Sequence, residues 1–555
     1  MKFESIKPRK PSRGSLTAQY AEINALLDQK ALSHAMQAWD NARRAYESWS
    51  ALTYLHFAQD TTNADYKAER EYADALSPFA IEMNTNVKKR LLSECNHADV
   101  EKHVGAHAVR LWECDVTTFA PEIAADLEAE SKLEARYTEI LASAKIEFDG
   151  KTHNLAGLAP YTESLNRGVR HAAETARWAF FAEHAEELDD IYDRLVKLRH
   201  TMAIKLGYKN YTPLAYRKMR RVDYDAGDVA HYRTEVLEYV TPLVARLVDE
   251  RRRANGWETI HYWDEKLIDP AGNPKPAGGH DYLVAQAQIM FDNMDKRLAH
   301  FYKSMNDGGF MDLKNRPTKA GGGFCTSFPT DGMPFIFANF NGTHGDINVF
   351  THEMGHAFQN YESRHQPNID YLWPTMESAE IHSMSLEFLT YPQMDLLVGP
   401  DAADRFRRMH LIGALEFLPY GVLVDHFQHD IYANPDMSQA ERRATWRRLE
   451  QIYMPWRDYG DLSHPETGAR FHAQGHIFGS PFYYIDYTLA QCCALQFWAK
   501  SQEDYKASLD AYVKLCALGG SAPFLSLVES AGLISPFAPG ALLTAVNTAN
   551  AVLMA

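Results

Sequence analysis

Apolar residues recur every three or four positions along much of the chain, a spacing that places them on one face of a helix. The pattern extends from about residue 15 to residue 140 and returns over residues 188–208. Ala, Leu, Glu, Lys and Arg dominate the first of these stretches, and all five have high helix propensity. The spacing therefore predicts a mainly α protein.

Two stretches interrupt the helical spacing. Alternating residues on either side of Asp149 and Gly150 predict a short β-hairpin near residues 145–155. Residues 259–280 contain three clusters of Pro or Gly, which indicate strand and loop rather than helix. The sequence shows no internal repeat and no low-complexity tract that would change the fold class.

A third interruption begins near residue 321. Two apolar, aromatic runs, residues 321–328 and 334–340, are joined by Pro329-Thr330-Asp331-Gly332 and predict a β-hairpin. A helix is expected to follow, because apolar residues recur at helical spacing from Ile347 onward. Asp346 is the expected N-cap of this helix.

The composition is that of a folded protein with a large core. The chain has 555 residues, of which 46% are hydrophobic and 12% are aromatic, so extensive disorder is excluded. A chain of this length forms about three to four domain-sized units or one large helical shell.

An excess of acidic residues argues against two kinds of binding partner. Asp and Glu number 73 against 57 Lys and Arg, a formal net charge of −16. Binding to phosphates relies on an excess of Lys and Arg, so neither nucleic acid nor a membrane surface is an expected partner. The six cysteines form no CxxC pair, no run of 18 apolar residues exists, and no apolar export segment follows the basic N-terminus. We therefore expect a cytoplasmic protein.

His352 and His356 form the strongest chemical signal in the sequence. They are four positions apart on the predicted helix, so both imidazoles can bind one Zn²⁺ ion. Glu353 lies between them and can take a proton from a water whose pKa the metal lowers to about 7. The His-Glu-x-x-His pattern therefore predicts a site that activates water for hydrolysis.

A catalytic zinc site needs a third protein ligand and one open position. Residues 376–389 form a second predicted helix, which offers Glu377, Glu380 and Glu387, with His382 nearby. Glu380 and Glu387 are seven positions apart and share a helix face. Spacing alone does not choose among the three glutamates, and at least one of them is expected to be a surface residue.

The two predicted helices together resemble a known family. The run His-Glu-Met-Gly-His-Ala-Phe-Gln, followed by Glu-x-x-Ser-x-x-x-Glu, is similar to the thimet oligopeptidase and oligoendopeptidase F group of zinc metallopeptidases, family M3. The resemblance implies that Glu380 is the third ligand of a single zinc ion, with Ser383 and Glu387 completing the pattern. It also implies that Glu387 accepts the second ring N–H of a zinc-bound histidine.

Residues 475–487 resemble a second element of this family, in which a Gly-His pair is followed by a flexible glycine-containing loop and several tyrosines. The resemblance assigns His476, Tyr484 and Tyr487 to holding the substrate carbonyl and the oxyanion. The loop is one residue shorter than the thimet pattern and has a proline in place of a tyrosine, which is closer to the oligoendopeptidase F and Pz-peptidase branch. This departure leaves the choice between Tyr483 and Tyr484 open, and a buried aromatic helix would give a similar pattern.

The resemblance also implies a fold. It predicts a mainly α protein whose two lobes enclose a deep channel, with zinc at its floor and a small β-sheet beside the His-Glu-x-x-His helix. We divide the chain into an N-terminal helical region, residues 1–190 with a short hairpin near 145–155, and a catalytic zinc metallopeptidase domain, residues 191–555. The run 334–340 would supply a strand edge along which an extended peptide pairs. A narrow channel would admit short unstructured peptides and exclude folded proteins.

We therefore expect a zinc-dependent oligoendopeptidase that hydrolyses internal bonds of short peptides, with Glu353 as the general base. A zinc carboxypeptidase of a related helical fold is one alternative, and it would need a positive group to hold the C-terminal carboxylate. A catalytically silent peptide-binding scaffold is another, although the intact Glu353 argues against it. The oligomeric state and the cleavage-site preference do not follow from the sequence.

Overall fold

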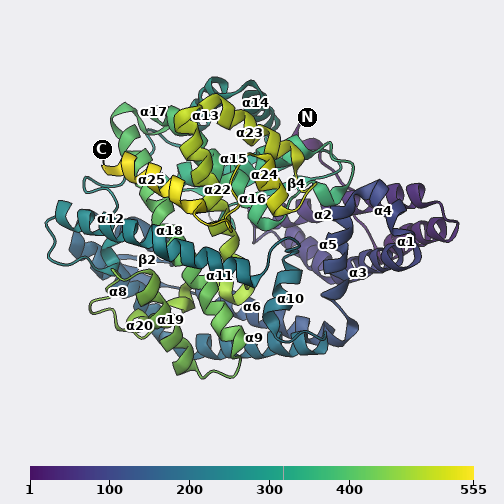
Figure 1. The fold of residues 1–555 in the computed structure, drawn as a ribbon, viewed down its shortest axis with the longest axis horizontal. Coiled ribbons are helices and arrows are strands. Elements are labelled where there is room, and N and C mark those ends of the chain that lie inside the picture. The colour runs from purple at the N-terminus through teal and green to yellow at the C-terminus, as the bar shows by residue number, and fades with distance from the viewer. Residues whose placement is uncertain (317, 555) are drawn as a thin grey trace. The chain divides into compact units, whose positions relative to one another are not determined.

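The computed structural model describes residues 1–316 and 318–554, which form many helices and two small sheets (Figure 1). The mainly α fold class predicted from the sequence is confirmed. Contacts within the chain define two compact units: unit 1 is Met1–Val116, Lys275–Asp401 and Cys493–Ile534, and unit 2 is Thr117–Pro274, Ala402–Cys492 and Ser535–Ala555. None of the helices in the described part is long and apolar enough to span a membrane.

Unit 1 contains helices from both ends and the middle of the chain. Their bounds are α1 (Arg13–Asp28), α2 (Leu32–Gln59), α3 (Ala64–Glu94), α4 (His97–Val104), α5 (Ala106–Thr117), α13 (His280–Met294), α14 (Lys296–Gly308), α15 (His344–Ser363), α16 (Met376–Leu389), α17 (Met394–Val398), α23 (Tyr505–Leu518) and α24 (Phe524–Ser530). Helices α1, α2, α3 and α5 share a buried apolar cluster that includes Trp39, Trp49 and Trp112. The rings of Trp39 and Trp112 lie 5.2 Å apart, close to edge-on.

The sheet of unit 1 has three strands, β3 (Met311–Lys314), β4 (Phe324–Phe328) and β5 (Met333–Phe340). Antiparallel pairing of β4 with β5 forms the predicted hairpin, and β3 pairs in parallel with the other side of β5. The order is therefore β3-β5-β4. The prediction that residues 334–340 supply an open strand edge is wrong, because β5 is the central strand and both of its edges are paired. In this sheet the open edges belong to β3 and β4.

Helix α15 carries the His-Glu-x-x-His motif and begins at His344, earlier than predicted. The expected N-cap, Asp346, lies instead in the first turn of the helix. Its carboxylate accepts the backbone N–H groups of Asn341 and Gly342, at 2.8 and 2.7 Å. Asp346 therefore closes the turn that precedes the helix, because these loop donors compete with the helix terminus for the same oxygen atoms. Helix α15 packs against β4, β5, α16 and α23.

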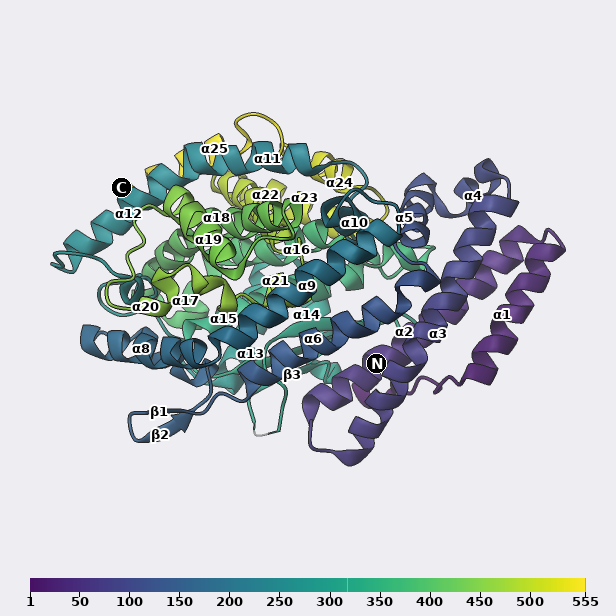
Figure 2. The same cartoon turned by 90° about the horizontal axis from the view of Figure 1, so that it is seen from below.

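Unit 2 contains helices from the middle of the chain and one from its C-terminal end. Their bounds are α6 (Ala124–Ala142), α7 (Ala159–Thr162), α8 (Arg167–Glu183), α9 (Ala185–Lys205), α10 (Tyr211–Lys218), α11 (Ala226–Glu235), α12 (Thr241–Ala254), α18 (Pro400–Ala433), α19 (Gln439–Tyr453), α20 (Ser463–Glu466), α21 (Gly475–Gly479) and α25 (Ala541–Met554). Helices α6 and α9 lie side by side (Figure 2). Helix α22 (Tyr484–Glu503) begins in unit 2 and ends in unit 1.

The two irregular stretches of unit 2 differ from each other. Strands β1 (Ile146–Phe148) and β2 (Lys151–His153) pair antiparallel around the Asp149-Gly150 turn. The strand expected within residues 259–280 is absent from the described residues, and one short 3₁₀ turn stands in its place. Buried Asp264 accepts hydrogen bonds from Arg167 and Arg170, and it also accepts a backbone N–H of the loop. Side chains therefore satisfy polar groups here that a strand would satisfy by pairing.

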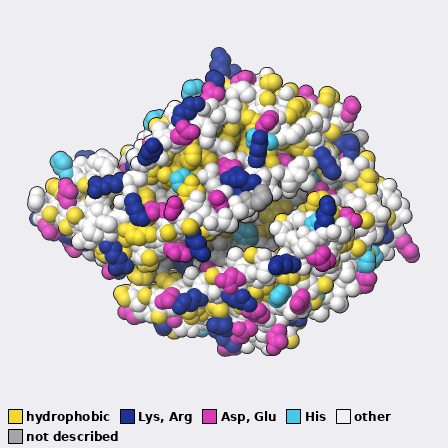
Figure 3. Space-filling view, turned by 180° about the vertical axis from the view of Figure 1, so that it is seen from behind, with side chains coloured by type: hydrophobic (Ala, Val, Ile, Leu, Met, Phe, Trp, Pro, Cys, Tyr) yellow, Lys and Arg dark blue, Asp and Glu magenta, His cyan; other side chains and the backbone are white. Residues whose placement is uncertain are grey.

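Basic and acidic side chains are interspersed over the face of the molecule drawn in Figure 3. Many pair within one turn of a helix, such as Lys197 with Asp193 and Lys303 with Asp307, both at 2.8 Å. Exposed pairs of this kind contribute about 0–1 kcal/mol each to stability. They mix the two signs of charge over the surface despite the acidic excess.

Buried histidines predict that the fold weakens in acid. Burial lowers the pKa of His382, His429 and His464 to about 4, from an ordinary value of 6.5. Between these two values the unfolded chain binds more protons than the folded chain, so stability falls as the pH is lowered through this range. Each histidine contributes up to about 3 kcal/mol to the loss. The melting temperature should therefore drop between pH 6.5 and pH 4.5, and His464→Gln should make the drop shallower. Substitution of the exposed His34 by Gln should leave the drop in melting temperature as large as in the wild type. The same drop in the wild type and in both variants would contradict the prediction.

Candidate metal centre and active site

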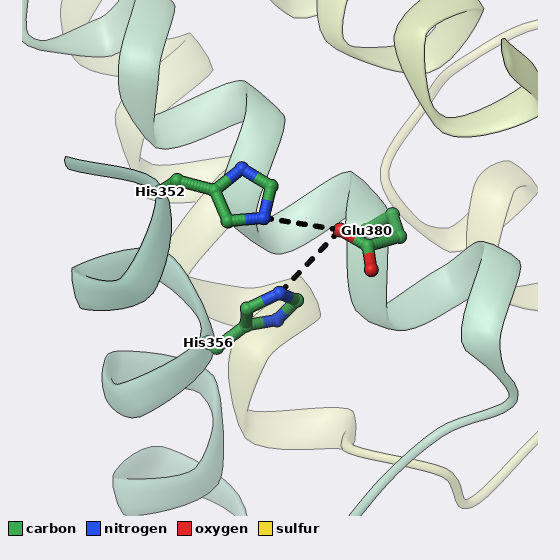
Figure 4. A group of neighbouring side chains, drawn as sticks. All are labelled: His352, His356 and Glu380. Carbon is green, nitrogen blue, oxygen red and sulfur yellow. Dashed lines mark ion pairs between the residues drawn. The ribbon is translucent and has the colours of Figure 1, made fainter. Parts of the chain in front are cut away.

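Gly355 allows α15 and α16 to approach closely. A Cβ atom at this position would lie 2.4 Å from the carbonyl oxygen of His382, a distance that non-bonded atoms do not reach. Any larger residue would therefore push the two helices apart. The close approach sets Glu380 of α16 opposite His352 and His356 of α15 (Figure 4).

The two histidines point their Nε2 atoms at one carboxylate oxygen. Glu380 Oε2 lies 3.3 Å from His352 Nε2 and 3.4 Å from His356 Nε2 (Figure 4). One ligand atom from each of the three residues lies within 4.8 Å of the others. Two imidazole nitrogens and one carboxylate oxygen are a donor set of catalytic zinc sites, so the residues present fit a metal ion.

Two further side chains orient this group. Glu387 Oε1 lies 2.8 Å from His352 Nδ1, so Nδ1–H donates to the carboxylate and Nε2 keeps its lone pair for a metal. Ser383 Oγ lies 2.9 Å from Glu380 Oε2 and can donate to it. The Glu-x-x-Ser-x-x-x-Glu pattern therefore places all three of its members around the histidines.

The charges of the group stabilise one another. Burial alone would raise the pKa of Glu380, but His356 and His352 hold it well below its usual range. Burial would likewise lower the pKa of His352, yet Glu380 and Glu387 raise it well above its usual range. An ionised carboxylate is ready to bind a metal, and a metal must displace a proton from His352. Metal binding at this group should therefore compete with protonation.

Glu353 lies beside the group but is not part of it. Its side chain is buried, and Oε2 has no hydrogen-bond partner among the described residues. A Cβ on Gly323 would lie only 3.7 Å from Glu353 Oε1, so the glycine-rich chain before β4 runs close to this carboxylate. Burial raises the pKa of Glu353 above its ordinary value, toward the range in which a general base works at neutral pH.

The other two candidates on α16 have different surroundings. Glu377 is buried, and its Oε1 accepts a hydrogen bond from Thr375 Oγ1 at 3.0 Å. His382 is fully buried, and its carbonyl accepts the hydroxyl of Tyr512 at 3.0 Å. The expectation that one of the three glutamates is a surface residue is wrong, because all three are buried or half-buried where α16 packs.

In unit 2, three tyrosine rings surround His476. The ring centroids of Tyr483, Tyr484 and Tyr487 lie 5.9, 4.9 and 5.8 Å from that of His476. Tyr484 is the first residue of α22 and Tyr487 follows one turn later, so the helix presents both to the histidine. Burial raises the pKa of Tyr484 well above its usual range, which keeps its O–H as a donor. Because Tyr483 is also within reach of His476, the choice between Tyr483 and Tyr484 stays open.

Two residues that orient His476 were not predicted from the sequence. Gln474 Nε2 lies 2.9 Å from His476 Nδ1, and Tyr420 donates its hydroxyl to Gln474 Oε1 at 2.5 Å. An amide N–H donated to Nδ1 leaves the ring proton on Nε2, so Nε2 becomes a hydrogen-bond donor. Gln474 could have been suspected from its place two residues before the histidine. Tyr420 could not, because it lies on a helix distant in sequence.

Two buried arginines hold the chain between His476 and the tyrosines. Arg199 Nη1 donates to the carbonyl of Ile477 at 3.2 Å, and Arg221 Nη2 donates to that of Phe482 at 2.6 Å. Phe482 is fully buried and adopts a left-handed conformation, with φ of 66°. The loop expected to be flexible is therefore anchored on both sides of its exposed residues 479–480.

A helix that carries His-Glu-x-x-His, with a glutamate from the next helix facing both histidines, defines a metallopeptidase. The chain belongs to peptidase family M3: the model of that family matches residues 290–545, and the model of the peptidase M3 N-terminal domain matches residues 3–119. No curated protein matches the chain.

Solved structures agree with this assignment over the whole chain. Pz peptidase A with an inhibitor has a TM-score of 0.95 at 39% identity, covering 100% of this chain and 99% of that one. A protein assigned as oligoendopeptidase F has a TM-score of 0.95 at 43% identity, with coverage of 100% and 99%. Another from Bacillus anthracis strain Ames has a TM-score of 0.90 at 40% identity, with coverage of 100% and 98%. The family and the enzyme class predicted from the sequence are confirmed, and the chain is an oligoendopeptidase-like metallopeptidase.

Because Glu380 faces the two histidines and Glu377 does not, we expect their substitution by alanine to affect the metal content differently. Glu380→Ala should lose most of the bound metal after dialysis, because the carboxylate that faces both histidines is removed. Glu377→Ala is the matched control on the same helix and should retain metal close to the wild-type ratio. Elemental analysis of both proteins, beside their melting temperatures, measures this. Full metal content in Glu380→Ala would remove that residue from the ligand set.

Proposed function

We propose that this metallopeptidase is a zinc-dependent oligoendopeptidase that hydrolyses internal bonds of short, unstructured peptides. The observation that carries the proposal is the convergence of His352 Nε2 and His356 Nε2 on Glu380 Oε2, beside the buried, unpartnered carboxylate of Glu353. These three ligands would hold one ion. When bound, zinc supplies a Lewis acid that lowers the pKa of water to about 7 and polarises a carbonyl.

Glu353 is proposed as the general base. Its free oxygen can accept the proton of the attacking water and later deliver that proton to the leaving amine. Burial raises the pKa of Glu353 above its ordinary value, a shift that favours uptake of the proton from the water.

His476 and the neighbouring tyrosines are proposed to stabilise the oxyanion. The hydrogen bond from Gln474 makes His476 Nε2 a donor, and the phenol groups of Tyr484 and Tyr487 are neutral donors at pH 7. Donors fixed in advance by their surroundings stabilise developing negative charge without reorganisation. The anchoring by Arg199 and Arg221 supports this role.

The peptide is proposed to extend along the outer edge of β4 rather than along β5. Main-chain pairing to a strand edge tolerates different side chains, which suits a broad range of peptides. Cys325, Thr326 and Ser327 of β4 line a cavity of about 480 Å³ together with α2, α3 and Trp373. The Trp373 ring lies 6.1 Å from that of His356, so this cavity adjoins the metal group.

The remaining parts of the proposal concern organisation and location. Every candidate site residue lies between 352 and 487, which supports residues 191–555 as the catalytic domain and 1–190 as an N-terminal helical region. The six cysteines include no CxxC pair, a usage that suits a reducing compartment, and we place the enzyme in the cytoplasm.

Glu353→Gln tests the proposed function directly. The amide keeps the shape of the carboxylate but cannot accept a proton, so turnover should fall about 10²–10⁴-fold while zinc content is unchanged. The assay is cleavage of a quenched fluorescent peptide blocked at both ends, with a chelator-treated wild type as the metal-free control. Wild-type rates in metal-replete Glu353→Gln would exclude this base. Failure of the wild type to cut any end-blocked peptide would exclude endopeptidase action.

Phenylalanine substitutions test the oxyanion donors. Removal of one donor that acts in the transition state should lower kcat about 10²–10³-fold in Tyr487→Phe and Tyr484→Phe, with a smaller change in KM. A tyrosine that only packs in the core would instead change the melting temperature. Tyr483→Phe is the matched control, and a loss of kcat there with none in Tyr484→Phe would move the role by one residue.

A further inference from the structure

The two histidines that face Glu380 are not held in the same way. His352 donates its Nδ1–H to Glu387 at 2.8 Å, whereas Nδ1 of His356 is buried and has no hydrogen-bond partner among the described residues. A histidine that binds a metal almost always donates its second ring N–H to a carboxylate, a carbonyl or a water, and that bond fixes the direction of the ring. Within residues 1–316 and 318–554, contacts of another kind must therefore orient His356.

The ring of His356 lies near the rings of His352 and Trp373. The centroid of the His352 ring is 5.0 Å away, with the two planes nearly perpendicular at 84°. The centroid of the Trp373 ring is 6.1 Å away, at an interplanar angle of 56°. Aromatic pairs are favourable at centroid separations of about 4.5–7 Å. Because His352 is itself a candidate ligand, Trp373 is the neighbour that can hold His356 from outside the metal group.

Trp373 is fixed by contacts on both its side chain and its backbone. Its indole Nε1–H donates to Ser327 Oγ of β4 at 3.2 Å. A Cβ atom at Gly520, in the chain after α23, would lie 2.5 Å from the carbonyl oxygen of Trp373, so the two backbones are in close contact. Gly520 also donates its backbone N–H to the carbonyl of Tyr371 at 2.9 Å. The indole ring therefore has little freedom to move.

The N-terminal helices also hold the loop that carries Trp373, residues 364–375. Asp370 Oδ2 accepts hydrogen bonds from Arg43 Nη1 of α2 at 2.7 Å and from Trp112 Nε1 of α5 at 3.1 Å. The side chains of Arg43 and Asp370 are only 6% and 7% exposed, so water screens this ion pair weakly. Because the loop joins α15 to α16, its position is fixed together with the two helices that carry the candidate ligands.

We propose that Trp373 is a positioning residue of the metal centre. Its ring holds His356 with Nε2 directed at Glu380, in place of the hydrogen bond by which Glu387 orients His352. All of these residues belong to unit 1, so the contact lies within one compact unit. The inference rests on the metal centre of the proposed function. Loss of the ring leaves His356 free to turn, which weakens metal binding and changes the coordination geometry.

Metal affinity is the quantity that decides this role, because Trp373 has a second set of neighbours. The same side chain lines the cavity of about 480 Å³ that β4 forms with α2 and α3. A change in the KM of a peptide could therefore come from a lost contact with substrate. A change in metal affinity that is measured without a peptide has no such origin.

Competition with a chromogenic chelator measures the zinc Kd of the full-length protein. Trp373→Leu should raise this Kd about 10- to 100-fold, the usual effect of losing a group that orients a metal ligand. Trp373→Phe keeps an aromatic ring and should recover most of the affinity. Ser327→Ala keeps the indole but removes its hydrogen-bond acceptor, so the Kd should rise by a smaller factor, about 2- to 10-fold.

Substitution of zinc by Co²⁺ gives a signature that a loss of stability alone does not produce. The visible bands of bound Co²⁺ depend on the coordination geometry, so they should change in Trp373→Leu at saturating Co²⁺ and stay close to the wild type in Trp373→Phe. Trp49→Leu is the matched control, because Trp49 is a buried tryptophan of unit 1 that donates to Glu69 at 3.1 Å. It should lower the melting temperature but leave the Kd and the bands unchanged.

Two results would overturn the inference alone. They are a zinc Kd in Trp373→Leu equal to that of the wild type, or an increase as large in Trp49→Leu. If Trp373→Leu does not fold, a wild-type Kd in Ser327→Ala would overturn it. A wild type that binds no zinc would remove the proposed metal centre and the inference together. Zinc binding without cleavage of any peptide would count against the proposed function, and the same variants would still decide the role of Trp373.

Discussion

The contact between α15 and α16 at Gly355 is the constraint on which the candidate metal centre depends. A buried glutamate facing two histidines is costly to form unless the opposite charges meet, and they meet only because the two backbones touch. Tyr512 holds the carbonyl of His382 from the other side, so the approach is fixed rather than adjustable. The ligand set is therefore a property of helix packing, and binding of a metal should be coupled to the integrity of the unit 1 core.

Two candidate histidines, His352 of unit 1 and His476 of unit 2, have opposite hydrogen-bond chemistry although the residue type is the same. Glu387 is an acceptor, so His352 donates from Nδ1 and keeps a lone pair on Nε2. Gln474 offers an amide N–H, so His476 accepts at Nδ1 and carries its proton on Nε2. One ring is thereby prepared to bind a cation and the other to donate to a negative charge. The partner behind the ring, rather than the histidine itself, sets the role.

Sequence reasoning predicted features that depend on local spacing, such as the helical stretches, the β4–β5 hairpin and the His-Glu-x-x-His pair. It misplaced Asp346, because the donors of that residue lie in the preceding turn rather than in the helix. It wrongly predicted an open strand edge for residues 334–340. Strand β3, from a separate segment, pairs in parallel with β5, and no short sequence pattern reveals that pairing. Sequence reasoning also could not find Tyr420, because the contact of Tyr420 with Gln474 depends on how a helix distant in sequence packs, not on neighbours in the chain.

Glu353 is a buried carboxylate that keeps Oε2 without a hydrogen-bond partner among the described residues. Burial of an acceptor without a donor is costly in folding. Exceptions of this kind to polar satisfaction are expected where a ligand completes the structure. Under the proposed function, the attacking water would supply the proton that this oxygen accepts, so the same atom that is costly for folding would be the one that the chemistry needs.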